Sequence, residues 1–261
     1  MSTMSYALRD STTMVRRRIK HMRRYPSLTI QLVGLPVVFL LLFVYVFGGT
    51  LGDGLGAGSG GRSEYVAYVT PGIILMAVAM VAMGTAVSVA MDMMEGVVAR
   101  FKTMAIARVS VLTGHVVAAM LQTFFAVAVV LAVAFAIGFR SDANVVEWFA
   151  AAGVLAMLAF ALTWLTVAMG LVAKTIDSAS NMPQPLVFLP LLGSGFVPTD
   201  SMPAGLRWFA DYQPFTPVIE TLRGLLLGTG IGANGFGAVA WSAGIALVGY
   251  LWARKLYNRQ D

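Results

Sequence analysis

Residues 65–91, YVAYVTPGIILMAVAMVAMGTAVSVAM, decide the fold, because this stretch contains no aspartate, glutamate, lysine or arginine. A helix of about 20 apolar residues spans the hydrocarbon core of a bilayer, and this stretch exceeds that length. It is also a continuous apolar run, not one of the segments of about 10 alternating residues that form an outer-membrane barrel. The sequence therefore predicts a transmembrane helix from Tyr65 to Met91.

Similar apolar stretches lie on either side of this one, and the whole chain has the composition of a membrane protein. Of the 261 residues, 58% are hydrophobic and 11% are charged, whereas a soluble domain is about half apolar and about a quarter charged. The further spans are predicted at Ser27 to Phe47, Leu112 to Ile137, Trp148 to Val172, Ile176 to Val197 and Gly235 to Ala253. We therefore expect an all-α polytopic membrane protein, a single transmembrane domain over residues 1–261 with six transmembrane helices between residues 27 and 253.

The basic residues are divided unevenly between the two sides of these spans. Lysine and arginine collect on the cytoplasmic side of membrane proteins. With both termini in the cytoplasm, the inner set is Arg9, Arg16, Arg17, Arg18, Lys20, Arg23, Arg24, Arg100, Lys102, Arg108, Lys174, Arg254, Lys255 and Arg259, and the outer set is Arg62, Arg140, Arg207 and Arg223. The charge distribution therefore predicts cytoplasmic termini, including a C-terminal tail at residues 254–261.

Residues 1–26 predict a cytoplasmic helix that lies in the membrane interface. Apolar residues recur there at helical spacing, and the basic residues fall on other faces, as in helices that bury one stripe among lipid tails. A plain positive-inside anchor is the alternative. A secretory signal peptide fits less well, because the apolar run begins only after Pro26 and is about twice the usual length.

The chain lacks the residue clusters that metal, nucleophile or nucleotide chemistry requires. It has no cysteine, and its two histidines, His21 and His115, are far apart in sequence, so each is interpreted as a membrane-boundary residue. No Gly-Lys dipeptide occurs, so a Walker A phosphate loop is absent. The glycines at residues 56–61 fit GxGxxG, but between membrane spans they indicate only a flexible loop from Gly48 to Arg62. The net charge of +6 favours anionic lipid headgroups over nucleic acid as a partner.

Residues 92–111, predicted to be cytoplasmic, contain the densest mixture of charges outside the N-terminal segment. On a short helix, Arg100 and Lys102 would meet an acidic partner surface while Phe101 and Met104 supplied apolar anchors. The pattern alone gives equal weight to a solvated loop that only satisfies the charge bias.

Three prolines, Pro183, Pro185 and Pro190, interrupt the predicted fifth span. Proline inside a helix removes a backbone donor and kinks or breaks the helix. In lipid such breaks persist only where protein or a water-filled cavity satisfies the freed carbonyls. This span is therefore predicted to be a broken helix that is packed in protein or lines a cavity.

The segment that follows, Gly195 to Gly228, is neither a clean span nor a polar loop. A full crossing would place Glu220 and Arg223 in hydrocarbon, at about 2.5 to 3.5 kcal/mol each. Two short helices that dip in from the outer face, within an outer re-entrant segment at residues 198–230, fit better. Glu220 and Arg223 are three residues apart and can pair, either as functional residues or as a structural pair. The residues assigned to this region are Phe196, Pro198, Met202, Pro203, Pro214, Pro217, Glu220 and Arg223.

Two of these stretches resemble the type-2 ABC transporter permeases, in particular the daunorubicin-resistance-like branch from actinobacteria. The first stretch, with Glu95-Gly96, Arg100-Phe101-Lys102 and Ile106-Ala107-Arg108, is similar to the coupling-helix region of that branch. The second, residues 195–228, has the aromatic residue and proline, the Met-Pro turn and the Pro-x-x-Pro of the family. The resemblance covers nearly the whole chain, although Ala99 and Ala105 stand where the branch often has an acidic residue and a proline.

The resemblance implies the permease half of an ATP-driven exporter in the bacterial cytoplasmic membrane. Glu95, Arg100, Phe101, Lys102 and Arg108 would couple this chain to its ATPase. Two permease chains, identical or related, would dock on two cytoplasmic ATPase subunits that bind ATP and Mg, so this chain itself would carry no cofactor, metal or catalytic residue. The substrate would be hydrophobic or amphipathic, either a drug or antibiotic or a lipid-like molecule.

Two other classes of membrane protein remain as alternatives. An ion-driven secondary transporter would show inverted repeats and charged residues near the midplane of several spans, and the predicted spans are almost free of such residues. A lipid-modifying membrane enzyme would need clustered acids, bases or metal ligands, whereas the carboxylates here are scattered.

Overall fold

The computed structural model describes residues 26–53, 61–94 and 108–259. Apart from Pro26, the predicted interfacial helix at residues 1–26 lies outside these ranges. The predicted coupling residues Glu95, Arg100, Phe101 and Lys102 also lie outside them.

All regular elements in the described ranges are helical, which confirms the all-α prediction. The long ones are α2 (Pro26–Leu42), α4 (Gly61–Met94), α6 (Arg108–Ala136), α7 (Val145–Val172) and α12 (Asn234–Arg259). Helix α2 continues through the π-helical turn η1 (Phe43–Phe47) into α3 (Gly48–Asp53). The short ones are α8 (Ile176–Asn181), α9 (Gln184–Phe188), the 3-10 turn η2 (Thr199–Ser201), α10 (Ala204–Tyr212) and α11 (Phe215–Leu227).

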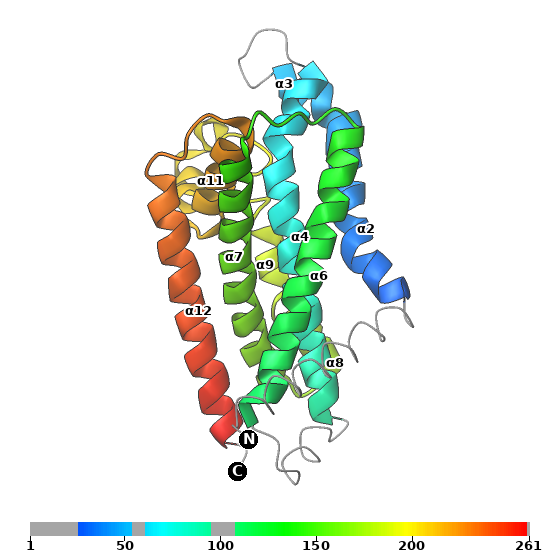
Figure 1. Ribbon diagram of the computed structural model, residues 1–261, viewed down its shortest axis with the longest axis vertical. Coiled ribbons are helices and arrows are strands. Elements are labelled where there is room, and N and C mark those ends of the chain that lie inside the picture. Colours follow the sequence, from blue (N-terminus) through cyan, green and yellow to red (C-terminus); the bar gives the residue numbers. More distant parts are fainter. Residues whose placement is uncertain (1–25, 54–60, 95–107, 260–261) are drawn as a thin grey trace.

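Helix α4 lies at the centre of the bundle, with α2, α6, α7 and α11 packed against it (Figure 1). Every residue from 69 to 82 on this helix is buried, as expected of a helix that is apolar on all sides. Helix α12 packs along α7. The stretch that predicted membrane residence from sequence is therefore also the core of the fold.

The prediction of six transmembrane helices is correct for five of them in the described residues. Five helices in the described residues are long and apolar enough to cross a membrane: Val33–Gly52, Gly61–Met94, Leu112–Ala136, Val145–Val172 and Asn234–Leu256. The predicted fifth span, residues 176–197, forms α8, α9 and a run of turns. Pro183 is the N-cap of α9 and Pro185 lies in its first turn. Proline is tolerated in those positions because the N–H that it lacks would have no partner within the helix. The prediction of a broken helix in this segment is confirmed.

The predicted loop from Gly48 to Arg62 is shorter than expected. Residues 48–53 extend the first span as α3, and Gly61 and Arg62 begin α4. The helical hydrogen bonds continue through η1 into Gly48 and Gly49, although each glycine costs about 1 kcal/mol relative to alanine in a helix.

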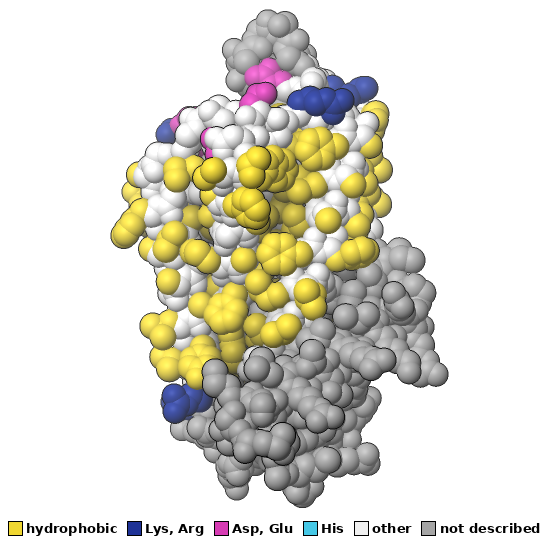
Figure 2. Space-filling view, viewed as in Figure 1, with side chains coloured by type: hydrophobic (Ala, Val, Ile, Leu, Met, Phe, Trp, Pro, Cys, Tyr) yellow, Lys and Arg dark blue, Asp and Glu magenta, His cyan; other side chains and the backbone are white. Residues whose placement is uncertain are grey.

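The side-chain surface of the bundle carries a broad apolar belt (Figure 2). Charged side chains collect at the two ends of the molecule in the same view. Large apolar side chains that are exposed on the long helices include Phe125 on α6, Phe149 on α7 and Leu247 on α12. An exposed apolar surface of this extent marks contact with lipid or with another protein.

Candidate functional site

Helix α11 begins and ends with residues suited to those positions, and it carries two charges on one face. Pro214 is its N-cap, and Gly228 ends it in the left-handed conformation with φ of 67°, which costs glycine little strain. Phe215, Ile219 and Leu222 are fully buried in the main core. Glu220 and Arg223 lie three residues apart, one turn along this anchored helix.

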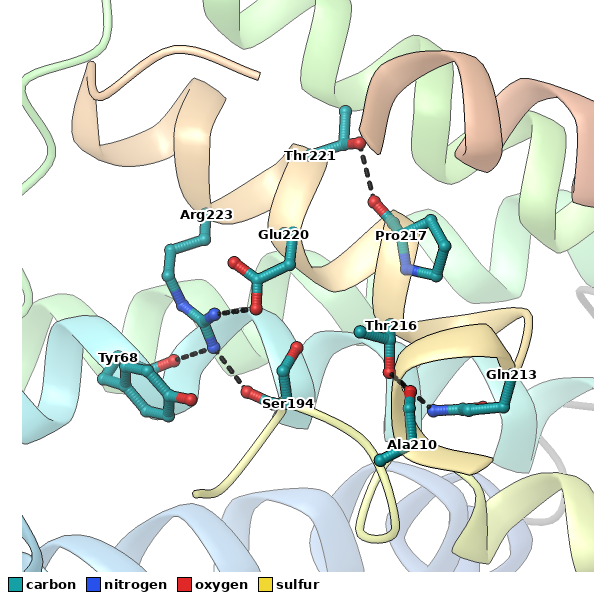
Figure 3. A network of polar contacts seen from close by, with 9 residues as sticks. All are labelled: Tyr68, Ser194, Ala210, Gln213, Thr216, Pro217, Glu220, Thr221 and Arg223. Atoms are coloured by element: carbon teal, nitrogen blue, oxygen red, sulfur yellow. Dashed lines mark hydrogen bonds and ion pairs between the residues drawn. The ribbon is translucent and has the colours of Figure 1, made fainter. Parts of the chain in front are cut away.

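Arg223 joins three separate parts of the chain (Figure 3). Its Nη1 atom pairs with the Glu220 carboxylate, so the predicted pairing of these two residues is confirmed. Its Nη2 atom donates to the main-chain oxygens of Tyr68 on α4, at 3.1 Å, and of Ser194, at 2.7 Å. The guanidinium also stacks on the Tyr68 ring, 3.8 Å from its centroid. With 12% of its side chain exposed, Arg223 is positioned to fasten the broken segment to both α4 and α11.

The turns after α9 are held against α4 by a second contact. The Tyr65 hydroxyl donates to the main-chain oxygen of Phe196 at 3.1 Å, and both residues are buried. The Phe196 ring packs on Phe43 of η1, with centroids 4.6 Å apart. Gly72 permits a close backbone approach, since a Cβ atom there would lie 2.6 Å from the oxygen of Gly195. Residues 193–196, within this non-helical backbone, are therefore buried in protein.

A third set of contacts ties the same turns to the start of α11. The Gln213 side chain donates to the main-chain oxygen of Leu189 at 3.2 Å and accepts from the N–H of Phe215 at 3.2 Å. Thr216 donates to the main-chain oxygen of Ala210 and accepts from Gln213. Since Gln213 is 4% exposed, these bonds are shielded from water. They satisfy the Phe215 N–H at the start of α11 and give the Leu189 oxygen a second donor beside the Leu192 N–H.

The predicted re-entrant residues fall at the boundaries of short helices. Pro198, Pro203 and Pro214 are the N-caps of η2, α10 and α11, and Met202 is the C-cap of η2. Pro217 lies within the first turn of α11, where proline is tolerated. Arg207 on α10 pairs with Asp200 and Asp211 at the surface.

A further polar contact lies at the opposite end of α4, and the sequence did not reveal it. The His115 Nε2 atom on α6 lies 3.0 Å from the Asp92 Oδ2 atom on α4. His115 was interpreted only as a membrane-boundary residue, and no motif connects it to Asp92. Arg108, the last of the predicted coupling residues, begins α6 at this same end.

Comparisons with known proteins agree with the resemblance seen in the sequence. The family model described as ABC-2 type transporter matches residues 10–227. The daunorubicin resistance ABC transporter permease protein DrrB1 of Streptomyces coeruleorubidus is 28% identical over 243 residues, which cover 92% of this chain and 80% of that protein. The probable doxorubicin resistance ABC transporter permease protein DrrC of Mycobacterium tuberculosis strain H37Rv is 24% identical over 225 residues, which cover 82% of this chain and 75% of that protein.

The family match begins before the first span and continues through the end of α11. It therefore includes the central helix α4, the broken segment and the Glu220–Arg223 pair. The chain belongs to the ABC-2 type transporter family, as a non-catalytic membrane permease subunit.

Proposed function

We propose that this permease exports a hydrophobic or amphipathic molecule, either a drug or a lipid-like compound, out of the bacterial cytoplasm. The energy comes from ATP and Mg bound on two copies of a separate ATPase subunit. Two permease chains, as a homodimer or with a related chain, form the membrane part. The observation that supports this function best is the broken segment at residues 189–197, held inside the bundle by Arg223, Tyr65 and Gln213.

Non-helical backbone at membrane depth is tolerated only where it is buried in protein or lines a water-filled cavity. Here side chains from α4, from α11 and from Gln213 just before α11 donate hydrogen bonds to main-chain oxygens of the broken segment. Every residue has such an oxygen, so when the segment shifts, the same donor can bond to the oxygen of a neighbouring residue. Arg223 can release Ser194 and still keep Glu220. In the proposed mechanism, residues 189–230 are the outer gate, and they separate from α4 when the substrate leaves.

Charge placement supports the orientation in which this gate is external. Exposed Arg254 and Lys255 lie near the end of α12, while Arg62 and Arg140 lie near the opposite ends of α4 and α6. Because basic residues favour the cytoplasmic side, we place both termini in the cytoplasm and the re-entrant helices α10 and α11 outside. In this orientation the chain must cross the membrane between the end of α7 and the start of α12. The broken segment makes that crossing, the fifth of six in chain order.

The coupling end in this orientation is the cytoplasmic end of α4 and α6. Glu95, Arg100, Phe101, Lys102 and Arg108 are the residues proposed to contact the ATPase. An ATPase dimer that binds the permease differently in its ATP-bound and free states supplies the coupling free energy. The names of the relatives, daunorubicin and doxorubicin resistance permeases, suggest these two drugs as the first substrates to examine.

The test is ATP-dependent uptake of fluorescent daunorubicin into inside-out vesicles that contain this permease and its ATPase. We expect drug accumulation with ATP and none when the ATPase carries a disabled nucleotide site. A labelled phospholipid probe in a parallel assay separates lipid export from drug export. Uptake driven by a proton or sodium gradient without ATP would reject the proposal in favour of a secondary transporter.

A further inference from the structure

The Asp92–His115 contact joins two helices that are consecutive in the chain. Asp92 lies in the last turn of α4, and His115 lies two turns into α6. Only 10% of the His115 side chain and 23% of the Asp92 side chain are exposed. Partial burial matters here, because a fully exposed ion pair contributes little, whereas a hydrogen bond to a charged group in a low-dielectric setting is stronger.

The geometry of the contact is that of a hydrogen bond from the imidazole to the carboxylate. An imidazole with its proton on Nε2 donates to the Asp92 carboxylate whether the ring is neutral or protonated. At 3.0 Å the distance is that of a hydrogen bond.

Beside this pair lies an apolar cluster that is separate from the main core. Val89 is one turn before Asp92 on α4, and Leu112 and Val116 flank His115 on α6. The inner cluster consists of Val89, Leu112, Val116, Trp164, Val167, Ala168, Leu171 and Ala253. It draws on α4, α6, α7 and α12, so the ends of four long helices meet there.

Close backbone packing adds to this attachment on the α7 side. A Cβ atom on Gly170 of α7 would lie 2.5 Å from the main-chain oxygen of Ala86 on α4, so the two helices approach closely there. Such an approach resembles the small-residue contacts that let membrane helices pack tightly. Helix α4 is thus fastened to α7 by close packing and to α6 by the Asp92–His115 pair.

We propose that the Asp92–His115 pair is a positioning element that makes the inner ends of α4 and α6 move as one body when the ATPase acts on them. This inference rests on the proposed function. Without the pair, a force applied at this end separates the two helix ends, and less displacement reaches the core of α4. Asp92 and His115 then act through the helices and do not touch the substrate.

The functional test measures daunorubicin uptake per ATP hydrolysed in proteoliposomes that contain the permease and its ATPase. Asp92→Ala and His115→Ala should each lower this ratio roughly tenfold, within the usual range of site-to-site coupling. The double variant should be no worse than Asp92→Ala alone, because that single variant already removes the contact with His115. Asp92→Asn should retain most of the ratio, since its amide oxygen still accepts from His115. Met91→Ala and Val117→Ala, at exposed neighbouring positions, are the matched controls.

A second measurement does not require transport of any drug. The chain has no cysteine, so labels can be confined to Met91→Cys and Val117→Cys. With the labelled permease diluted into an excess of unlabelled permease, and with a cysteine-free ATPase, the spin labels report the distance between these two positions on α4 and α6. We expect one narrow distance distribution, unchanged between the nucleotide-free and vanadate-trapped complexes. Adding Asp92→Ala should broaden it and make it depend on the nucleotide state.

The outcomes separate this inference from the proposed function. Absence of ATP-driven uptake by the unaltered complex contradicts the proposed function, while the spin-label distances still test the pair. Distances that change with nucleotide in the unaltered chain, or that ignore Asp92→Ala, overturn the inference. Additive losses in the double variant of a functional complex overturn it as well.

Discussion

Replacing Arg223 by methionine removes the cation that joins α4, α11 and the broken segment, while preserving most of the side-chain volume. The variant leaves the Glu220 carboxylate without its partner. It also leaves the main-chain oxygens of Tyr68 and Ser194 without the hydrogen bonds that Arg223 donates to them. Lysine is not an equivalent replacement, because a single ammonium lacks the planar fork that reaches several acceptors.

The expected cost follows from burial. Removing one partner of a buried ion pair costs about 3–5 kcal/mol. Because 30% of the Glu220 side chain is exposed, water partly solvates the remaining carboxylate, and we expect the lower end, about 3 kcal/mol. At about 2–4 °C for each kcal/mol in a chain of this size, the unfolding midpoint should fall by about 6–12 °C.

The measurement is thermal unfolding of the purified permease in lipid nanodiscs, followed by tryptophan fluorescence. Arg207→Met is the matched control, since its guanidinium also pairs with carboxylates but 49% of its side chain is exposed. That control should lose less than about 1 kcal/mol. The double variant Glu220→Gln/Arg223→Met should recover part of the loss, because it no longer leaves a partly buried carboxylate unpaired.

Two results would refute this reasoning. Equal midpoints for Arg223→Met and Arg207→Met would show that burial of the Arg223 network contributes nothing to stability. A double variant as unstable as Arg223→Met would show that the unpaired carboxylate is not the source of the cost.

Two further predictions concern the same broken segment. Gly72→Ala should destabilise the protein by about 1–3 kcal/mol, because the new Cβ atom would lie 2.6 Å from the Gly195 oxygen. Gly153→Ala is the control: this position has open space around it, so the unfolding midpoint should not fall. Equal losses of stability in the two variants would contradict the close approach of Gly72 and Gly195. Gln213→Leu should cost about 1–3 kcal/mol, because the buried Phe215 N–H loses its acceptor and the Leu189 oxygen loses the bond from Gln213. Faster hydrogen exchange around residues 189–197 checks this, and unchanged exchange would count against it.

Membrane residence and the positions of five spanning helices could be predicted from sequence, because lipid requires each crossing segment to satisfy its own backbone. The apolar run at residues 65–91 was sufficient for this purpose. Breakage of the segment at residues 176–197 was also predictable, since Pro183 and Pro185 act through local backbone geometry. Hydropathy counts this fifth segment as a span like the others, and only its prolines distinguish it from the five continuous helices.

The pairing of Glu220 with Arg223 belongs to the part of the site that sequence determined, since a helix places residues three apart on one face. The remaining partners of Arg223 were decided only by the tertiary structure. Tyr68 is 155 residues away in the chain and Ser194 is 29 residues away, and both accept through main-chain oxygens that carry no sequence signal. The Asp92–His115 contact has the same origin, because it depends on how α4 and α6 pack side by side. Helical spacing fixes which residues share a face, but only the packed bundle fixes which faces meet.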